Sequence, residues 1–321
     1  MYQVSVVIPN FNGKELLQDC LETLPFNENY ELIVVDNGSS DGSIQMLMEK
    51  YPYVTRICND NNMGFSAAVN QGIKEAKAPY VILLNNDTKI REGFIEALKD
   101  TLDNDPGIFS ASSCMVSMKE PDIIDDTGDY YNALGWAFTL GKGKPVAKYQ
   151  KMRKVFSACG GASIYRKEVF EKIGYFDENH FAYLEDVDVG FRSQIYGYKN
   201  VYNNKAVCLH VGSAYSGSRY NPFKISLSAQ NSIYIIYKNM PLIMLLINLP
   251  FLLPGFLIKS LFFLLKGQIK PYFSGLGKGF KLCFSKKGRA KKVRFSFAHI
   301  GNYCRIQGNL WLNLFRRITN S

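Results

Sequence analysis

Three short apolar runs decide the fold: VSVVI at residues 4–8, ELIVV at residues 31–35 and YVILL at residues 80–84. Each run is continuous rather than alternating, and the residues between the runs carry apolar side chains at helical spacing, as at Leu17, Leu21 and Leu24. Continuous apolar strands separated by helices are typical of a parallel sheet that is covered on both faces. The sequence therefore predicts an α/β protein with a doubly wound, mostly parallel sheet.

Further elements follow from the same patterns. Strands are expected at residues 54–58 and 162–165, and helices at residues 14–24, 40–51, 64–76, 92–102, 167–173 and 185–196. Between about residue 110 and residue 154 the pattern loosens into short alternating segments, which favours an antiparallel insertion or mobile loops. We assign no chemistry to that segment.

Composition excludes several classes of protein. The chain has 321 residues, of which 47% are hydrophobic and 21% charged, so it has too little charge for a disordered protein. Its 7 cysteines are scattered without a CxxC pair, which argues against a disulfide framework or a thiolate zinc site and favours a reducing compartment. The N-terminal MYQVSVVIP lacks the features of a secretory signal, and we expect it to form the first strand.

Charge divides the chain into two regions. Residues 1–188 hold all 28 acidic residues and 18 of the 38 basic ones, a net charge of −10, whereas residues 189–321 hold 20 basic residues and no acidic one. Within the basic region, residues 242–265 form the most apolar part of the chain, where Pro250 and Pro254 are expected to break or kink a helix. We expect this combination to associate with anionic lipid rather than nucleic acid. A spanning helix, and a buried core helix with a solvated basic tail, are the alternatives.

Polar residues follow each of the three apolar runs: PNFNG at residues 9–13, DNGSSDG at residues 36–42 and NNDT at residues 85–88. Each cluster alone could be an ordinary turn, but in a parallel sheet the three would meet in one crevice, where ligands bind. A dinucleotide-binding turn is excluded because PNFNG offers one glycine, and the chain lacks a Walker lysine. A diphosphate would then be neutralised by a metal ion on a carboxylate, for which Asp87 is the candidate.

A second polar group, EDVD at residues 185–188, opens a helix. Acidic residues in a first helical turn are stabilised by the helix dipole, and Asp188 is spaced to pair with Arg192, so we interpret Asp188 as structural. Asp186 lies on another face and could act as a general base. His210 lies between Leu209 and Val211, where a buried core histidine is the ordinary alternative to a ligand.

Taken together, these stretches resemble family 2 glycosyltransferases, most closely the rhamnosyltransferase-like members that build bacterial surface polysaccharides. The resemblance covers roughly residues 3–215 and rests on SVVIPNFNG, IVVDNGSSDGS, NDNNMGFSAAVNQGI, VILLNNDT, ACGGASIYRKEVFEKIGYFDE, FAYLEDVDVGFR and CLHVGSAYS. It implies a GT-A fold over residues 1–220, with a nucleotide-sugar-binding half at residues 1–109 and an acceptor half at residues 110–220. Residues 221–321 would be a helical, basic, membrane-associating extension.

The resemblance also implies roles for particular residues. Nucleotide-sugar binding falls on Pro9, Asn10, Phe11, Asp36, Asn62, Gly64 and Asn85. The family's DxD metal motif falls on residues 85–87, where Asn85 replaces the first aspartate, so Asp87 and His210 would hold the Mg²⁺ or Mn²⁺ ion. The ED motif falls on Glu185 and Asp186, with Asp186 as the base.

The resulting hypothesis is an inverting, metal-dependent glycosyltransferase in cell-surface polysaccharide biosynthesis. It would move a sugar, with rhamnose as one candidate, from a dTDP- or UDP-sugar to a lipid-linked or polysaccharide acceptor. We expect it at the cytoplasmic face of the cell membrane, bound peripherally or monotopically and without a nucleic-acid partner. A catalytically weak nucleotide-sugar-binding protein is the alternative if Asn85 abolishes metal binding.

Overall fold

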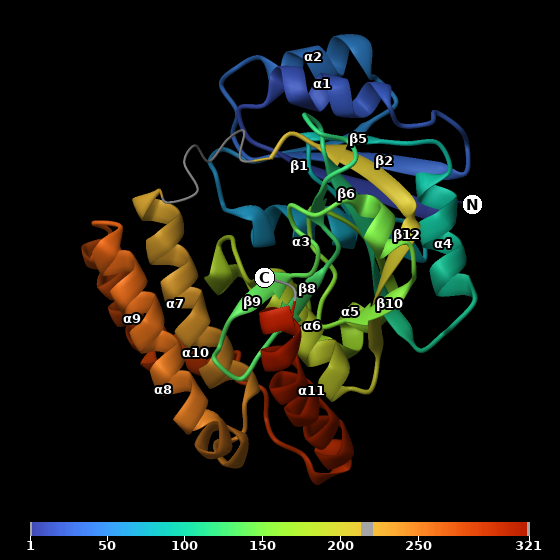
Figure 1. Ribbon diagram of the computed structural model, residues 1–321. Helices are drawn as coiled ribbons and strands as arrows, with labels where there is room; N and C mark the ends of the chain where they lie inside the picture. The colour runs from blue at the N-terminus through green and yellow to red at the C-terminus, as the bar shows by residue number, and fades with distance from the viewer. Residues whose placement is uncertain (1, 213–220, 320–321) are drawn as a thin grey trace.

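A large mixed sheet forms the centre of the molecule in the computed structural model, which describes residues 2–212 and 221–319 (Figure 1). The strand order is β10-β12-β6-β11-β4-β1-β2-β3, and β4, β1, β2 and β3 are parallel. These strands are β1 (Val4–Asn10), β2 (Tyr30–Asp36), β3 (Thr55–Cys58), β4 (Tyr80–Leu84), β6 (Ile108–Ser117), β10 (Arg153–Val155), β11 (Ala162–Arg166) and β12 (Lys199–His210). The predicted α/β class is confirmed.

Helices cover both faces of this sheet. Val4, Val6 and Ile8 of β1 share a core with α1 (Lys14–Glu22), α2 (Ser43–Lys50) and α4 (Phe94–Asp103). Val7 points to the opposite core, which includes α3 (Phe65–Glu75), α5 (Lys167–Ile173) and α6 (Glu185–Ile195). Gly72 lets α3 approach the sheet, because a Cβ at this position would lie 2.2 Å from Val7 Cγ1. The sheet is therefore doubly wound, as the apolar runs predicted.

The segment from residue 110 to residue 154 differs from the prediction at its start. β6 is a ten-residue strand inside the main sheet, antiparallel to β11 and parallel to β12. Serines interrupt the apolar pattern of IFSASSCMVS, but Ser110, Ser112 and Ser113 are buried and hydrogen-bonded, as where Ser110 Oγ donates to Asn200 Oδ1 at 2.8 Å. After β6 the secondary-structure elements are short and irregularly spaced, as expected. They are β7 (Ile124–Asp126), β8 (Asp129–Tyr131), β9 (Ala137–Thr139) and the 3₁₀ turn η1 (Val146–Tyr149).

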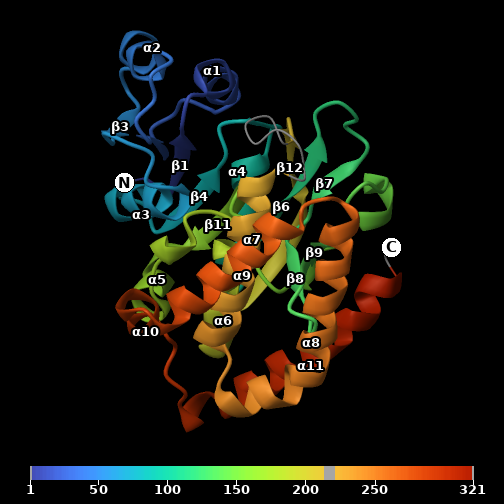
Figure 2. The same ribbon diagram turned by 90° about the vertical axis from the view of Figure 1, so that its left-hand side faces the viewer.

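The basic region folds into helices that pack beside the sheet domain (Figures 1 and 2). They are α7 (Pro222–Asn239), α8 (Leu242–Leu265), α9 (Ile269–Phe284), α10 (Lys286–Ala290) and α11 (Ile300–Thr319), with the 3₁₀ turn η3 (Phe297–His299) before the last. Ile235, Leu252 and Ile306 share a buried core with Phe156 and Phe191 of the sheet domain. The division at residue 220 stays a prediction: Ile225, Ala229 and Tyr272 form a small core within the helical region, but the larger cluster is shared with the sheet domain.

Pro250 and Pro254 do not break α8, which continues as one helix from Leu242 to Leu265. Figure 2 shows that it bends along its course. Proline removes an intrahelical hydrogen bond and crowds the preceding turn, which accounts for a bend rather than an end.

Candidate functional site

A cavity of about 450 Å³ opens at the carboxyl ends of β1 and β4. Of the predicted residues, those that line it are Pro9, Asn10, Phe11, Asn62, Gly64, Asn85, Asp87 and His210. β5 (Thr88–Ile90) follows Asp87 and pairs with β12, so that Thr88 stands opposite His210 in the sheet. The topology thus brings together residues that are far apart in the sequence.

Hydrogen bonds to buried neighbours fix the side chain of Asn10 in the cavity wall. Its side-chain amide donates to Asp36 Oδ2 at 2.8 Å, and its Oδ1 accepts from Asn86 Nδ2 at 2.7 Å. Asp36 is 1% exposed and also accepts from the Ser39 backbone N–H at 2.8 Å. Asp36 therefore orients Asn10 and the following loop, while its predicted contact with a nucleotide base stays a prediction. Phe11 is 40% exposed at the rim, where an aromatic face could stack on a base.

Asn62 and Gly64 shape the opposite wall. The Asn62 side-chain oxygen accepts from the Gly64 N–H at 2.9 Å. Gly64 has a φ of +88°, and a Cβ there would lie 2.6 Å from the Phe181 ring. Glycine is thus required both by the backbone conformation and by the close approach of Phe181, which also lines the cavity.

Asp87 and His210 form the polar end of the cavity. Asp87 Oδ1 is buried without a hydrogen-bond partner and lies 3.3 Å from His210 Nε2. His210 Nδ1 lies 2.5 Å from Oδ2 of Asp125, which also pairs with Lys142 at 2.6 Å. Burial opposes the charged imidazole, but the Asp125 and Asp87 carboxylates outweigh it and raise the pKa of His210 to about 9.

These residues fit a divalent cation. The Asp87 carboxylate and the His210 imidazole, once it has lost its proton, are a donor pair that Mn²⁺ and Mg²⁺ accept, with further ligands from phosphate oxygens and water. Among the described residues, no group of three or more His, Cys, Asp or Glu side chains is arranged to hold a metal by itself. Asp87 and His210 can therefore supply part of a metal site that a bound diphosphate would complete.

Asp186 stands at the start of α6, close to the cavity but outside its lining. Its Oδ1 accepts from the Val187 N–H at 2.7 Å and its Oδ2 from the Gly160 N–H at 3.4 Å, while Gly160 packs against Phe65 of the cavity wall. Burial raises the pKa of Asp186 to about 6. A carboxylate of this kind is ionised at neutral pH and basic enough to accept a proton.

Glu185, the other residue of the ED motif, is 7% exposed, and its Oε2 has no hydrogen-bond partner. Burial, reinforced by the neighbouring Asp186, raises its pKa well above the ordinary value. Its predicted catalytic role stays a prediction. Asp188 is structural, as predicted: it forms an ion pair with Arg192 at 2.9 Å, and Lys238 of α7 adds a second at 2.8 Å.

The loop before α6 has unfavourable backbone conformations and is held by hydrogen bonds from α7. Phe181, Tyr183 and Leu184 have φ values of 60°, 69° and 67°, which are costly for residues other than glycine. Asn231 of α7 donates its side-chain amide to the carbonyls of His180, Ala182 and Tyr183 at 3.0, 2.9 and 2.7 Å. The basic region thus fixes a loop that lines the cavity.

Among the residues of this site that the sequence analysis missed, three hold other site residues in place. Asp125 contacts His210, and Asp129 forms a hydrogen bond with Asp186; both lie in the segment to which no chemistry was assigned. The third, Asn231, lies in α7. For the aspartates a signal existed, because IDDTGD at residues 124–129 concentrates acidic residues around a glycine. The last residues of the CLHVGSAYS motif, 213–216, lie outside the described residues.

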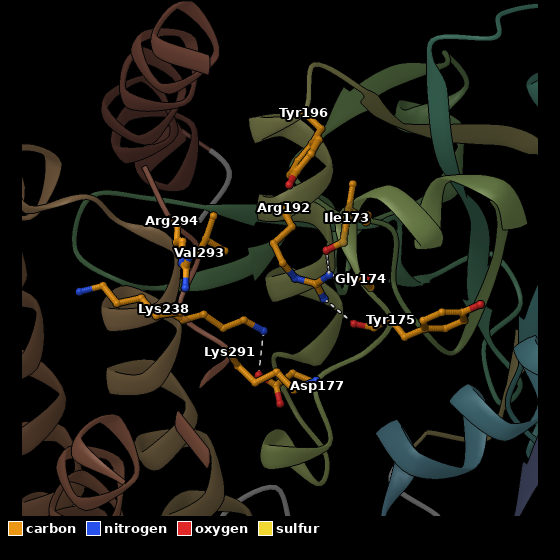
Figure 3. Close-up of a pocket in the computed structure, with 11 residues that line it drawn as sticks. Ile173, Gly174, Tyr175, Asp177, Arg192, Tyr196, Lys238, Lys291, Val293 and Arg294 are labelled. Atoms are coloured by element: carbon orange, nitrogen blue, oxygen red, sulfur yellow. Dashed lines mark hydrogen bonds and ion pairs between the residues drawn. The ribbon is translucent and has the colours of Figure 1, made fainter. Parts of the chain in front are cut away.

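A second cavity, of about 360 Å³, lies between the α5–α6 side of the sheet domain and residues 291–294 (Figure 3). The buried cations in its wall are engaged: Arg192 donates to the Ile173 and Tyr175 carbonyls, and Lys238 pairs with Asp177 at 2.8 Å. Both cations therefore belong to the buried ion-pair network that joins α6 to α7, and we assign no catalytic residue to this cavity.

The fold and the strand-end cavity define a glycosyltransferase of the GT-A type. The chain belongs to glycosyl transferase family 2, whose family model matches residues 5–174. It is 28% identical over 206 residues to an N-acetylglucosaminyl-diphospho-decaprenol L-rhamnosyltransferase of Mycobacterium tuberculosis, an alignment covering 56% of this chain and 66% of that protein. It is 30% identical over 134 residues to the glycosyltransferase GlyG of Streptococcus pneumoniae, covering 40% and 39%. The rhamnosyltransferase-like resemblance is thereby confirmed, although the chain spans less than two thirds of these relatives.

Solved structures share the fold at low identity. The structure of GalNAc-T7 with UDP, GalNAc and Mn²⁺ has a TM-score of 0.61 at 16% identity and covers 74% of this chain and 48% of that one. The mannosyltransferase PcManGT from Pyrobaculum calidifontis, solved with GDP-Man and Mn²⁺, has a TM-score of 0.54 at 17% identity and covers 97% and 86%. Both comparisons support the GT-A architecture.

Proposed function

We propose that the protein is an inverting, metal-dependent glycosyltransferase that moves a sugar, with rhamnose as the leading candidate, from a dTDP- or UDP-sugar to a hydroxyl of a lipid-linked or polysaccharide acceptor. One observation carries the proposal. The buried Asp87 carboxylate and the His210 imidazole meet at one end of the strand-end cavity, and Asp186 stands behind Gly160, which packs against Phe65 of the cavity wall. This arrangement separates a leaving-group site from a base.

The chemistry follows from these positions. Asp87 and His210 would hold a Mg²⁺ or Mn²⁺ ion, which supplies positive charge opposite the departing diphosphate. Asp186 would accept the proton of the acceptor hydroxyl as its oxygen bonds to the anomeric carbon and the bond from that carbon to the diphosphate oxygen breaks. A single displacement inverts the anomeric centre, as in inverting glycoside hydrolysis, and needs no covalent enzyme intermediate.

The acceptor half of the proposal draws on the relatives. The mycobacterial relative is named for a decaprenol-linked diphosphate sugar, which supports a lipid-linked acceptor here. Helices without acidic residues pack beside the catalytic domain, and Asn231 of α7 is hydrogen-bonded to the cavity loop, which supports an apolar and basic acceptor surface close to the cavity.

The test is a panel of dTDP- and UDP-sugars, each incubated with the full chain and Mg²⁺ or Mn²⁺, with release of nucleoside diphosphate as the readout. We expect release from one donor class, stimulated by an extracted lipid-linked acceptor and abolished by chelation. Tight donor binding without release under any of these conditions would instead identify a nucleotide-sugar-binding protein, the alternative that Asn85 in place of a metal-binding aspartate favours.

A further inference from the structure

α8 exposes an unusually apolar surface. It has a mean hydropathy of 2.0 over its most apolar window, and 22% of that window is buried in the protein. Its large apolar side chains that are between 38% and 86% exposed are Leu242, Ile243, Leu246, Ile247, Leu249, Leu253, Leu257, Ile258, Leu261, Phe262, Leu264 and Leu265. Isolated exposed leucines are common, but a contiguous patch of this size marks an interaction surface.

α9 extends this surface and adds charge to it. Phe273, Phe280 and Phe284 are 57%, 55% and 65% exposed, and Lys278 and Lys281 lie exposed between them. Figures 1 and 2 show α8 and α9 on the side of the helical layer that faces away from the sheet. We call the exposed apolar residues of α8 together with these residues of α9 the docking face.

We propose that the docking face lies in the plane of an anionic bilayer, as at the cytoplasmic face of the cell membrane, and that α8 does not cross that bilayer. This proposal does not depend on the proposed reaction.

Charge identifies a bilayer as the occupant. All 20 charged residues after Asp188 are basic, and Lys270, Lys278, Lys281, Lys286 and Lys287 are exposed on or next to α9. Each basic residue near an anionic lipid surface contributes about 1 kcal/mol. A second copy of the chain would bring the same positive charge against itself, whereas anionic lipid satisfies both the apolar side chains and the lysines.

The packing of α8 explains why it would lie on the membrane rather than span it. Its buried stripe includes Asn248, which exchanges hydrogen bonds of 2.7 and 2.9 Å with Gln307 of α11. At Gly255, a Cβ would lie 2.3 Å from the Leu134 carbonyl oxygen, and Trp136 Nε1 donates to the Gly255 carbonyl at 3.2 Å.

These contacts, from Met244 in the shared core to Lys259 over the Trp136 ring, cover about 22 Å of helix at about 1.5 Å per residue. A helix that crosses a bilayer must pass through about 30 Å of hydrocarbon, which offers no partner to polar groups from a water-soluble domain. To cross, α8 would have to separate from α11, which would break the hydrogen bonds between Asn248 and Gln307 and leave the Asn248 amide in hydrocarbon. With these contacts intact, only the exposed side of α8 can contact lipid.

Vesicle flotation of the full chain tests the docking. We expect binding to phosphatidylcholine vesicles that strengthens when phosphatidylglycerol is added and weakens with salt. Triple replacement of Leu246, Leu253 and Leu257 by Glu should weaken binding to both vesicles about 100-fold or more, because it puts charge where lipid tails must lie. Met48→Glu, which changes an apolar residue 54% exposed on the sheet domain, is the matched control and should bind like the parent.

The charge contribution is separated by Lys278→Glu with Lys281→Glu. This variant should lose about 30-fold in affinity for the anionic vesicles and little for the neutral ones, from about 1 kcal/mol for each lysine removed. Absence of binding to either vesicle at low salt would overturn the proposal. A lipid-free dimer that the leucine variant dissociates, seen by sedimentation, would instead assign the face to a second copy and would also overturn it.

The in-plane geometry is tested at the end of α8. Lys266→Cys is introduced with the exposed Cys58 and Cys304 replaced by Ser, and the bound protein is treated with a membrane-impermeant maleimide. We expect the same extent of maleimide labelling in intact and in detergent-dissolved vesicles. The control is the protein that carries both serine replacements and retains Lys266, which measures labelling at the remaining cysteines. Protection in intact vesicles that detergent removes would show that the helix crosses.

Discussion

Asn231→Ala tests the dependence of the active-site loop on α7. Asn231 is fully buried, and its amide group donates to three carbonyls of the loop that carries Phe181, Tyr183 and Leu184 in left-handed conformations. Left-handed conformations of this kind persist only where surrounding contacts hold them. Alanine removes the donor and leaves the three carbonyls without it.

The magnitude follows from the bonds lost. Each net hydrogen bond contributes about 1 kcal/mol, and the carbonyls stay partly desolvated, so we expect the free energy of unfolding to fall by about 2–3 kcal/mol. Because Phe181, Ala182 and Tyr183 line the cavity, relaxation of the loop should also weaken donor binding by about tenfold, equivalent to about 1.4 kcal/mol.

Urea denaturation and titration with the donor found by the nucleotide-sugar panel measure the two effects. Ser228→Ala on the same helix is the control, because the Ser228 hydroxyl makes no hydrogen bond to the loop. It should leave the free energy of unfolding and the donor affinity unchanged. If Asn231→Ala retains parental stability and donor affinity, the loop is held by its own packing, and the hydrogen bonds from Asn231 do not stabilise it.

Four further predictions concern the site itself. Asp186→Asn should abolish transfer while leaving donor affinity within a few-fold, because it removes the proton acceptor and no nucleotide contact; near-parental turnover would exclude Asp186 as the base. Asp87→Ala should weaken Mn²⁺ and donor binding, with His210→Ala milder; full activity of chelated parental protein would exclude the metal role of both. Asp125→Asn should lower Mn²⁺ affinity about 10- to 100-fold in direct titration, because the His210 ring loses its orienting carboxylate, and an unchanged affinity would make this contact structural. The transfer rate should fall about tenfold per pH unit below about 6, since burial raises the pKa of Asp186 to about 6 and protonation removes the base; a flat profile down to about pH 4 would contradict that assignment.

The sequence by itself determined the parallel half of the sheet and one wall of the site. The apolar runs of β1, β2 and β4 became parallel strands, and parallel strands with crossover helices must end at one edge, so Asn10 and Asp87 had to meet there. The pairing of Asp188 with Arg192 was also local, because residues four apart face each other on a helix.

The tertiary structure alone decided the rest, because the partners are distant in the chain. Asp125 reaches His210 across 85 residues, and Asn231 reaches Tyr183 across 48, so no local pattern predicts either contact. β6 escaped recognition because its serines look exposed in sequence, yet they find buried partners in the folded sheet. For α8, composition fixes only that the helix is apolar and long enough to span a membrane. Which side of it is free depends on the Asn248–Gln307 contact and the close approach at Gly255, which exist only once α11 and the sheet domain are packed together.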